Sequence, residues 1–85
     1  MGKDQPGTVK TDFGMFETVR KGNLYRTIIQ RGLSLDYPYQ LSMDCIDMDT
    51  GRGYPEYTHS FRSYSAAFRK MQKYFKGENV EWRKI

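Results

Sequence analysis

Cys45 and His59 are the only residues in this 85-residue chain that could act together as a nucleophile and a base. A catalytic thiol needs a neighbouring histidine that lowers its pKa, and the histidine needs a third group that orients it. Both residues fall in the middle of predicted strands, whereas reactive groups more often lie on loops. We therefore expect Cys45 to be a small core residue, and we predict neither enzymatic activity nor catalytic residues.

Three aspartates, Asp44, Asp47 and Asp49, could supply the carboxylate oxygens that hard cations prefer. The segment that begins at Asp47 resembles the start of a calcium loop, but its glycine comes one position early and its last position holds Thr58 in place of glutamate. The glycines around Arg52 lack the spacing of a phosphate-binding loop. We expect an exposed acidic strand end, with no metal, no cofactor and no small-molecule substrate.

Basic residues gather near the end of the chain, although the net charge is only +4. Residues 57–77 hold five bases and no acid, whereas residues 33–56 hold five acids and one base. Like charges three or four positions apart on a helix repel each other, so a face without acids suggests an anionic partner. The alternative is an ordinary solvated face that needs no partner. The predicted contacts to nucleic acid or another partner on this face are Arg62, Arg69, Lys70, Lys73 and Lys76.

A second candidate surface combines aromatic rings with cations along the first two predicted strands. Sheets that bind single-stranded nucleic acid stack bases on aromatic rings and hold phosphates with basic side chains. The alternative is that these rings lie beneath the N-terminal segment or the segment around Trp82. The residues of this candidate surface are Phe16, Arg20, Tyr25 and Arg31.

The basic residues lie on the one strongly predicted helix, residues 63–76. Ser63 can cap its first turn, and Gly77 follows its last. Apolar side chains recur with the helical period and predict one buried stripe. This stripe contains Tyr64, Ala67, Phe68, Met71 and Phe75.

Residues 13–20 and 24–31 predict a β-hairpin around Lys21-Gly22, with Val19 opposite Leu24 and Glu17 opposite Arg26. Both faces of this hairpin are mixed, and we favour one of them as the core face. The favoured face contains Phe13, Met15, Val19, Leu24 and Ile28.

A second hairpin is predicted from the strand that begins at Tyr39 and continues past Cys45 to Asp47, and from residues 54–61. Its first strand alternates clearly, with Tyr39, Leu41, Met43 and Cys45 on one face. A turn centred near Arg52 would place Met43 opposite Phe61, Cys45 opposite His59 and Asp47 opposite Tyr57. The segment around Trp82 is expected to form a short last strand or an extended tail.

These elements predict an α+β fold, in which a four-stranded antiparallel meander packs on one C-terminal amphipathic helix, with a possible short fifth edge strand. Residues 1–11 are expected to be a flexible tail, and residues 12–85 one domain. The single cysteine and the absence of a long apolar run favour a cytoplasmic protein without a membrane span.

The functional hypothesis that follows is a small non-enzymatic module that binds nucleic acid or a nucleoprotein complex through its basic helix face. The alternative is a protein–protein inhibitor or adaptor, of the type made by phages and mobile elements, that binds and blocks a host enzyme. The sequence does not define the oligomeric state.

Overall fold

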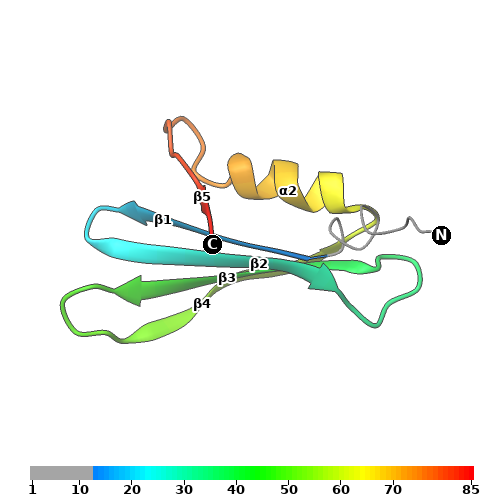
Figure 1. The fold of residues 1–85 in the computed structure, drawn as a ribbon, viewed down its shortest axis with the longest axis horizontal. Coiled ribbons are helices and arrows are strands. Elements are labelled where there is room, and N and C mark those ends of the chain that lie inside the picture. Colours follow the sequence, from blue (N-terminus) through cyan, green and yellow to red (C-terminus); the bar gives the residue numbers. More distant parts are fainter. Residues whose placement is uncertain (1–12) are drawn as a thin grey trace.

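The computed structural model describes residues 13–85, so the predicted tail of residues 1–11 lies outside the described residues. Five strands form one antiparallel sheet in the order β4-β3-β2-β1-β5, and helix α2 packs across one face of it (Figure 1). The α+β prediction of a four-stranded meander with a C-terminal helix is confirmed, and a short fifth edge strand is present. The elements are β1 Phe13–Arg20, β2 Asn23–Arg31, β3 Tyr39–Asp47, β4 Gly53–Phe61, α2 Tyr64–Gln72 and β5 Arg83–Lys84.

The first hairpin has the predicted register because a two-residue turn determines it. Lys21 and Gly22 both have positive φ, 52° and 82°, which is the conformation of the tight hairpin turns that match strand twist. Val19 therefore pairs with Leu24, and Glu17 pairs with Arg26.

The predicted core face of this hairpin is wrong. The structure buries the opposite face, on which Ile29 and Tyr25 of β2 pair with Leu41 and Cys45 of β3. That face continues the apolar alternation of β3, whereas Ile28, on the predicted face, pairs with Ser42. The helix covers the face whose apolar surface extends across all of the central strands.

The predicted register of the second hairpin is also wrong. Phe61 pairs with Tyr39, and His59 pairs with Leu41. The turn is tighter than predicted, because the Asp47 carboxylate accepts a hydrogen bond from the backbone N–H of Asp49 (2.8 Å), and the Asp47 carbonyl accepts one from Gly51. Tyr57 consequently lies opposite Met43.

A bulge between Met43 and Asp44 then shifts the pairing by one residue, so that Pro55 faces Asp44 and Tyr54 faces Cys45. Neither the tight turn nor the bulge carries an apolar signal, so alternation alone does not reveal them.

Two buried clusters lie between the sheet and the chain that follows β4. In the first, Ala67 and Met71 of α2 pack on Ile29 and Leu41. In the second, the segment after α2 covers the other end of the sheet, where Phe75 packs on Tyr25 with ring centroids 4.8 Å apart.

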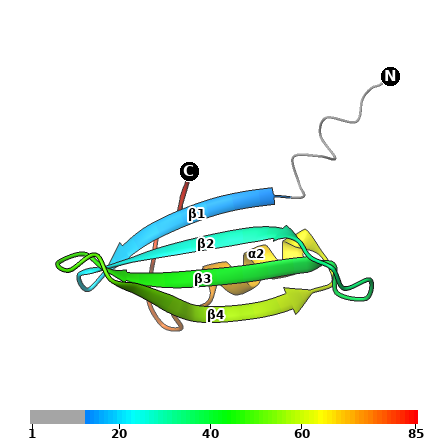
Figure 2. The same ribbon diagram turned by 90° about the horizontal axis from the view of Figure 1, so that it is seen from below.

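The face opposite α2 has no described element over it, and Figure 2 looks directly onto it with the helix behind the sheet. We call it the open face. Its outward side chains come from β1 (Phe13, Met15, Glu17, Val19), β2 (Leu24, Arg26, Ile28, Gln30) and β3 (Gln40, Ser42, Asp44, Ile46).

Candidate nucleic-acid interface

A hollow of about 620 Å³ runs along the exposed side of α2 and the turn that follows it. Four of the predicted cations line it: Arg69, Lys70, Lys73 and Lys76. We call this surface the basic groove. The structure therefore brings together four of the five basic residues predicted on the helix face.

Helix α2 positions these side chains by burying its apolar side. The Ser63 hydroxyl caps the helix by accepting a hydrogen bond from the backbone N–H of Ala66 (3.1 Å). Ala67 and Met71 point into the core and are fully buried. Because successive residues are about 100° apart around a helix, this burial turns Arg69 and Lys70 toward solvent.

The helix ends earlier than predicted, at Gln72, and Lys73 is its C-cap. The backbone N–H of Lys73 donates to the carbonyls of Arg69 and Lys70, and that of Tyr74 donates to Met71, so the last turn tightens. The chain then reverses at Gly77, whose φ of 78° is readily accessible to glycine. Lys76 reaches the groove from this turn and not from the helix.

The groove cations have no ion-pair partner within residues 13–85. The ion pairs of that part of the chain join Glu17 to Arg26 and Arg83, and Glu78 to Arg20. Glu78 is the one acid among the described residues that line the groove, and its pairing with Arg20 lowers its pKa. It therefore stays charged, and Arg20 largely offsets its negative charge.

One groove cation has an aromatic contact. The Lys70 ammonium lies 5.5 Å from the centre of the Tyr57 ring, within the range of a cation–π interaction. This contact limits where Lys70 can reach, so Arg69, Lys73 and Lys76 are the freer cations for binding an anion.

Arg62, the fifth predicted cation, is separate from the groove. It precedes α2, and its guanidinium lies 5.3 Å above the ring of Tyr37, in the loop that connects β2 to β3. The groove begins a full helical turn later, at Ala66. The structure does not group Arg62 with the other four.

The second candidate surface, built on Phe16, Arg20, Tyr25 and Arg31, is not an exposed stacking surface, and this interpretation is wrong. Phe16 and Tyr25 are each only 7% exposed. The Phe16 ring packs on Phe68 of the helix, and the Tyr25 ring packs on Phe75. No base could stack on rings that are already covered. The alternative was cover by the N-terminal segment or the segment around Trp82. Trp82 packs against both buried clusters, whereas the ring contacts come from Phe68 and Phe75.

The two cations of that surface lie at opposite ends of β1 and β2. Arg20 pairs with Glu78 and places its guanidinium 4.6 Å from the centre of the Phe75 ring. Arg31 lies beside Tyr39, whose hydroxyl accepts a hydrogen bond from its guanidinium (3.1 Å). They do not form one site.

The possible nucleophile and base are not brought opposite each other. Cys45 is buried and pairs with Tyr54, whereas His59 is exposed and pairs with Leu41. Burial raises the pKa of Tyr25, and contact with the Cys45 thiol raises it further. The thiol lies among tyrosine side chains and not beside an imidazole.

The three aspartates do not converge either. The Asp47 carboxylate accepts hydrogen bonds from its own turn, and Asp44 lies on the open face. Within residues 13–85, no group of three histidine, cysteine or acidic side chains has the arrangement of a metal site.

The connection of residues 32–38, which joins β2 to β3, carries two exposed leucines that the sequence patterns do not single out as a candidate surface. Leu33 and Leu35 are fully exposed at its tip, with exposures of 101% and 97%. The backbone N–H of Gly32 donates to the Pro38 carbonyl (2.7 Å), and that of Tyr37 donates to the Ser34 hydroxyl (3.1 Å), so the loop is closed by its own hydrogen bonds. The sequence signal that could have indicated this exposed pair is the alternation of the two leucines with Ser34 and Asp36 between two strands.

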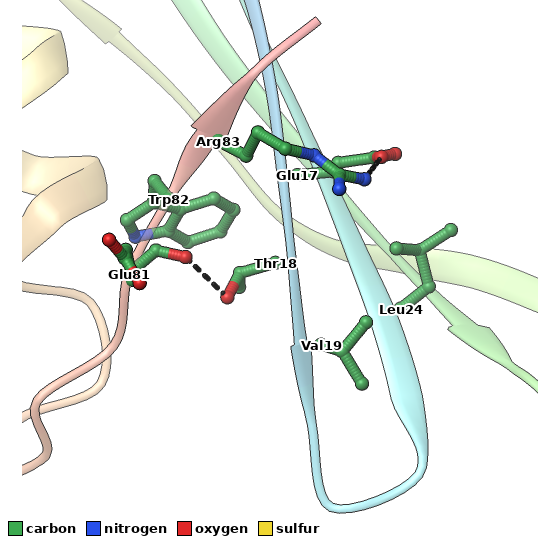
Figure 3. Close-up of a pocket in the computed structure, with 7 residues that line it drawn as sticks. All are labelled: Glu17, Thr18, Val19, Leu24, Glu81, Trp82 and Arg83. Atoms are coloured by element: carbon green, nitrogen blue, oxygen red, sulfur yellow. Dashed lines mark hydrogen bonds and ion pairs between the residues drawn. The ribbon is translucent and has the colours of Figure 1, made fainter.

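A smaller hollow, of about 410 Å³, lies where the C-terminal segment meets the edge of β1 (Figure 3). The Thr18 hydroxyl donates a hydrogen bond to the Glu81 carbonyl (2.8 Å), which attaches this segment to the sheet. On the other side of β1, Glu17 accepts a hydrogen bond from Arg83 (Figure 3). Among the described residues, the lining of this hollow has an ion pair at its rim and no row of free cations.

Comparisons with protein-family models, curated proteins and solved structures find no match to this chain. None of the helices in the described part of the chain is long and apolar enough to cross a membrane.

Proposed function

We propose that this chain is a small non-enzymatic binding module that contacts the phosphate backbone of nucleic acid through the basic groove. The observation that carries the proposal is the set of four cations around one hollow, without an ion-pair partner in residues 13–85. Phosphate contacts of this kind give affinity with little dependence on sequence.

The shape of the groove supports a backbone contact more than a base contact. Its walls are a helix side and a turn, and the rings of Tyr74 and Phe75 are occupied by contacts with each other and with the sheet. Cations without free stacking rings recognise phosphate spacing and not base identity. We therefore expect similar binding to oligonucleotides of different sequence.

The test is fluorescence anisotropy with labelled single- and double-stranded oligonucleotides over a salt series. The logarithm of the parent's binding constant should fall linearly with the logarithm of salt concentration, because binding releases counterions. Replacing Lys73 and Lys76 by glutamine should reduce the slope by about 0.7–0.9 per lost phosphate contact. Glutamine is chosen because an acid at the helix C-terminus would oppose the helix dipole.

The matched control is Lys21→Gln with Lys84→Gln, which removes the same charge from exposed positions outside the groove. This control should retain most of the parental salt slope. If the parent shows no salt-dependent binding, or if both double variants lose binding equally, the groove is not a phosphate site.

The β2–β3 loop favours a second candidate function, that of a protein-binding inhibitor or adaptor. Two fully exposed leucines on a loop that is closed by hydrogen bonds form a preorganised apolar anchor, which loses little entropy on binding. Leu33→Ser with Leu35→Ser leaves the groove intact. In the oligonucleotide assay this variant should therefore behave as the parent does, whereas a protein partner would be lost.

A further inference from the structure

The open face carries a row of four alternating charges that crosses the sheet at right angles to its strands. In the strand register, Arg83 of β5 lies opposite Glu17 of β1, Glu17 lies opposite Arg26 of β2, and Arg26 lies opposite Asp44 of β3. Glu17 forms ion pairs with both arginines, and its distance from Arg26 is 3.5 Å. The row therefore has two positive and two negative members and no net charge.

Apolar side chains flank this row on both sides. Met15 and Ile28 face each other across β1 and β2 on one side of the row, and Val19 and Leu24 do so on the other. Val19 is 57% exposed, and no described element covers these residues (Figure 2). The open face is thus two apolar strips separated by a neutral charged row, which is unusual for a surface that only contacts water.

We propose that the open face is a self-association surface, on which a second copy of this chain packs face to face to form a two-layer sandwich of sheets. The symmetry axis would run parallel to the strands, between β1 and β2, in the plane between the two copies. Aligned sheets pack in this way in β-sandwiches, with strand directions within about 30° of each other.

The order of the charges is what favours a second copy. Rotation about this axis reverses the row, so Glu17 faces Arg26 of the second copy, and Arg83 faces Asp44 of the second copy. Every charge then meets its opposite. The same rotation places Met15 over Ile28 and Val19 over Leu24, so that apolar side chains meet apolar side chains.

The size of the face indicates how strong this association should be. β1, β2 and β3 are about 4.8 Å apart and about 26 Å long, and β5 adds only two residues, so the face covers roughly 400 Å² per copy, or roughly 800 Å² in total. This area is below the roughly 1,000 Å² of a stable specific interface, so the association should be weak. We expect a reversible dimer that is populated from about 100 µM upward.

The first measurement is light scattering coupled to size exclusion, on the parent from about 10 µM to about 1 mM. The mean mass should rise from 10.1 kDa toward twice that value as concentration increases. Val19→Asp, which touches none of the four charges, should keep the protein monomeric. A parent that stays monomeric at about 1 mM, or a Val19→Asp variant that dimerises as the parent does, overturns the proposal.

Two charge reversals test the arrangement itself. Glu17→Arg places like charges face to face in a homodimer, as does Arg26→Glu, so each variant alone should be monomeric. In a mixture, the arginine introduced at position 17 of one chain faces the glutamate introduced at position 26 of the other, and the two unchanged residues, Arg26 and Glu17, also face each other. Every pair is restored, so a heterodimer should form. A mixture that remains monomeric while the parent dimerises overturns the proposed axis.

Circular dichroism at low concentration establishes that each single variant is folded before mixing. Because each chain keeps its own defect in the mixture, recovery of the dimer cannot result from repair of the fold within one chain. Dimerisation of either charge variant alone, at the parental concentration, also contradicts the proposal.

Discussion

The covered face and the open face of the sheet are built from the same strands, and they differ in how their apolar residues continue from one strand to the next. On the covered face, Ile29 and Tyr25 of β2 continue into Leu41 and Cys45 of β3. On the open face, Ile28 continues into Ser42. The most apolar surface is buried when the helix packs on the face whose apolar residues continue from one strand to the next. Continuity across strands, and not alternation within one hairpin, decides which side is the core.

The two faces also differ in how they accommodate charge. On the covered face the Tyr74 hydroxyl donates a hydrogen bond to the Glu56 carboxylate (2.8 Å), in a partly buried position. On the open face Glu17 is held between two arginines of neighbouring strands. One face contains a partly buried neutral hydroxyl, and the other contains an ion-paired surface, so the two faces should respond differently to truncation, to added volume and to pH.

The largest difference is expected when matched side chains are truncated on adjacent positions of β2. Ile29→Ala should lower the free energy of unfolding by about 2–5 kcal/mol, because Ile29 is fully buried and its loss leaves a cavity. Ile28→Ala should cost less than about 1.5 kcal/mol, because a half-buried side chain loses less contact. Urea unfolding at about 5 µM protein measures both, and equal losses would contradict the difference between the faces.

Added volume should produce an intermediate difference. A Cβ atom on Gly14, on the covered side, would lie 2.2 Å from the Tyr64 hydroxyl oxygen and 2.8 Å from the Phe16 ring. Gly14→Ala should therefore cost about 1–3 kcal/mol by overpacking.

The control for this substitution is Gly53→Ala, where the nearest atom is Cγ1 of Ile46 at 3.2 Å and a shift of a few tenths of an ångström suffices. Thermal melting of both variants checks the order. If Gly14→Ala is as stable as Gly53→Ala, then Tyr64 of the helix does not pack closely against Gly14 of β1.

The smallest difference is expected in the dependence of stability on pH. Burial, followed by the hydrogen bond to Glu56, raises the pKa of Tyr74 to about 12 from its ordinary value of 10. The contribution of Tyr74 to the free energy of unfolding is complete below pH 10 and is lost as pH rises through 12. The hydrogen bond from Arg83 lowers the pKa of Glu17 below 4.5, so its contribution is complete above pH 4.5 and is lost as pH falls below that value.

Two conservative variants separate these effects. Tyr74→Phe should flatten the alkaline limb of the stability profile and leave the acid limb unchanged, whereas Glu17→Gln should do the reverse. Denaturant unfolding from about pH 3 to about pH 12 measures both limbs. A variant that alters both limbs equally would indicate that the two faces are not independent.

The sequence predicts the parts of the fold that local chemistry determines. The register of the first hairpin follows from Lys21-Gly22, and the start of the helix follows from the Ser63 cap. The core face of that hairpin does not follow, because both of its faces contain apolar residues and the choice depends on β3. The register of the second hairpin depends on the Asp47 turn and on the bulge at Met43, and neither is visible in apolar alternation.

The sequence also predicts the arrangement of the candidate site only in part. Helical periodicity placed Arg69, Lys70 and Lys73 together, and the groove contains them. Helical periodicity does not predict that Lys76 lies on a turn beside the other three cations. The helix ends before Lys76 because Tyr74 and Phe75 pack against the sheet. The leucines at 33 and 35 were missed because exposure of a loop is a property of the whole fold.

The buried thiol has a kinetic consequence. Cys45 is the only cysteine of the chain and is 2% exposed, in the cluster that the segment after α2 covers. A thiol reagent can therefore reach it only when that end of the sheet opens, so the labelling rate reports the opening equilibrium of this cluster. A ligand or a second copy that binds only the closed form would slow labelling in proportion to its occupancy. The chain thus contains an intrinsic reporter of its own fluctuations, at one defined position, without any added label.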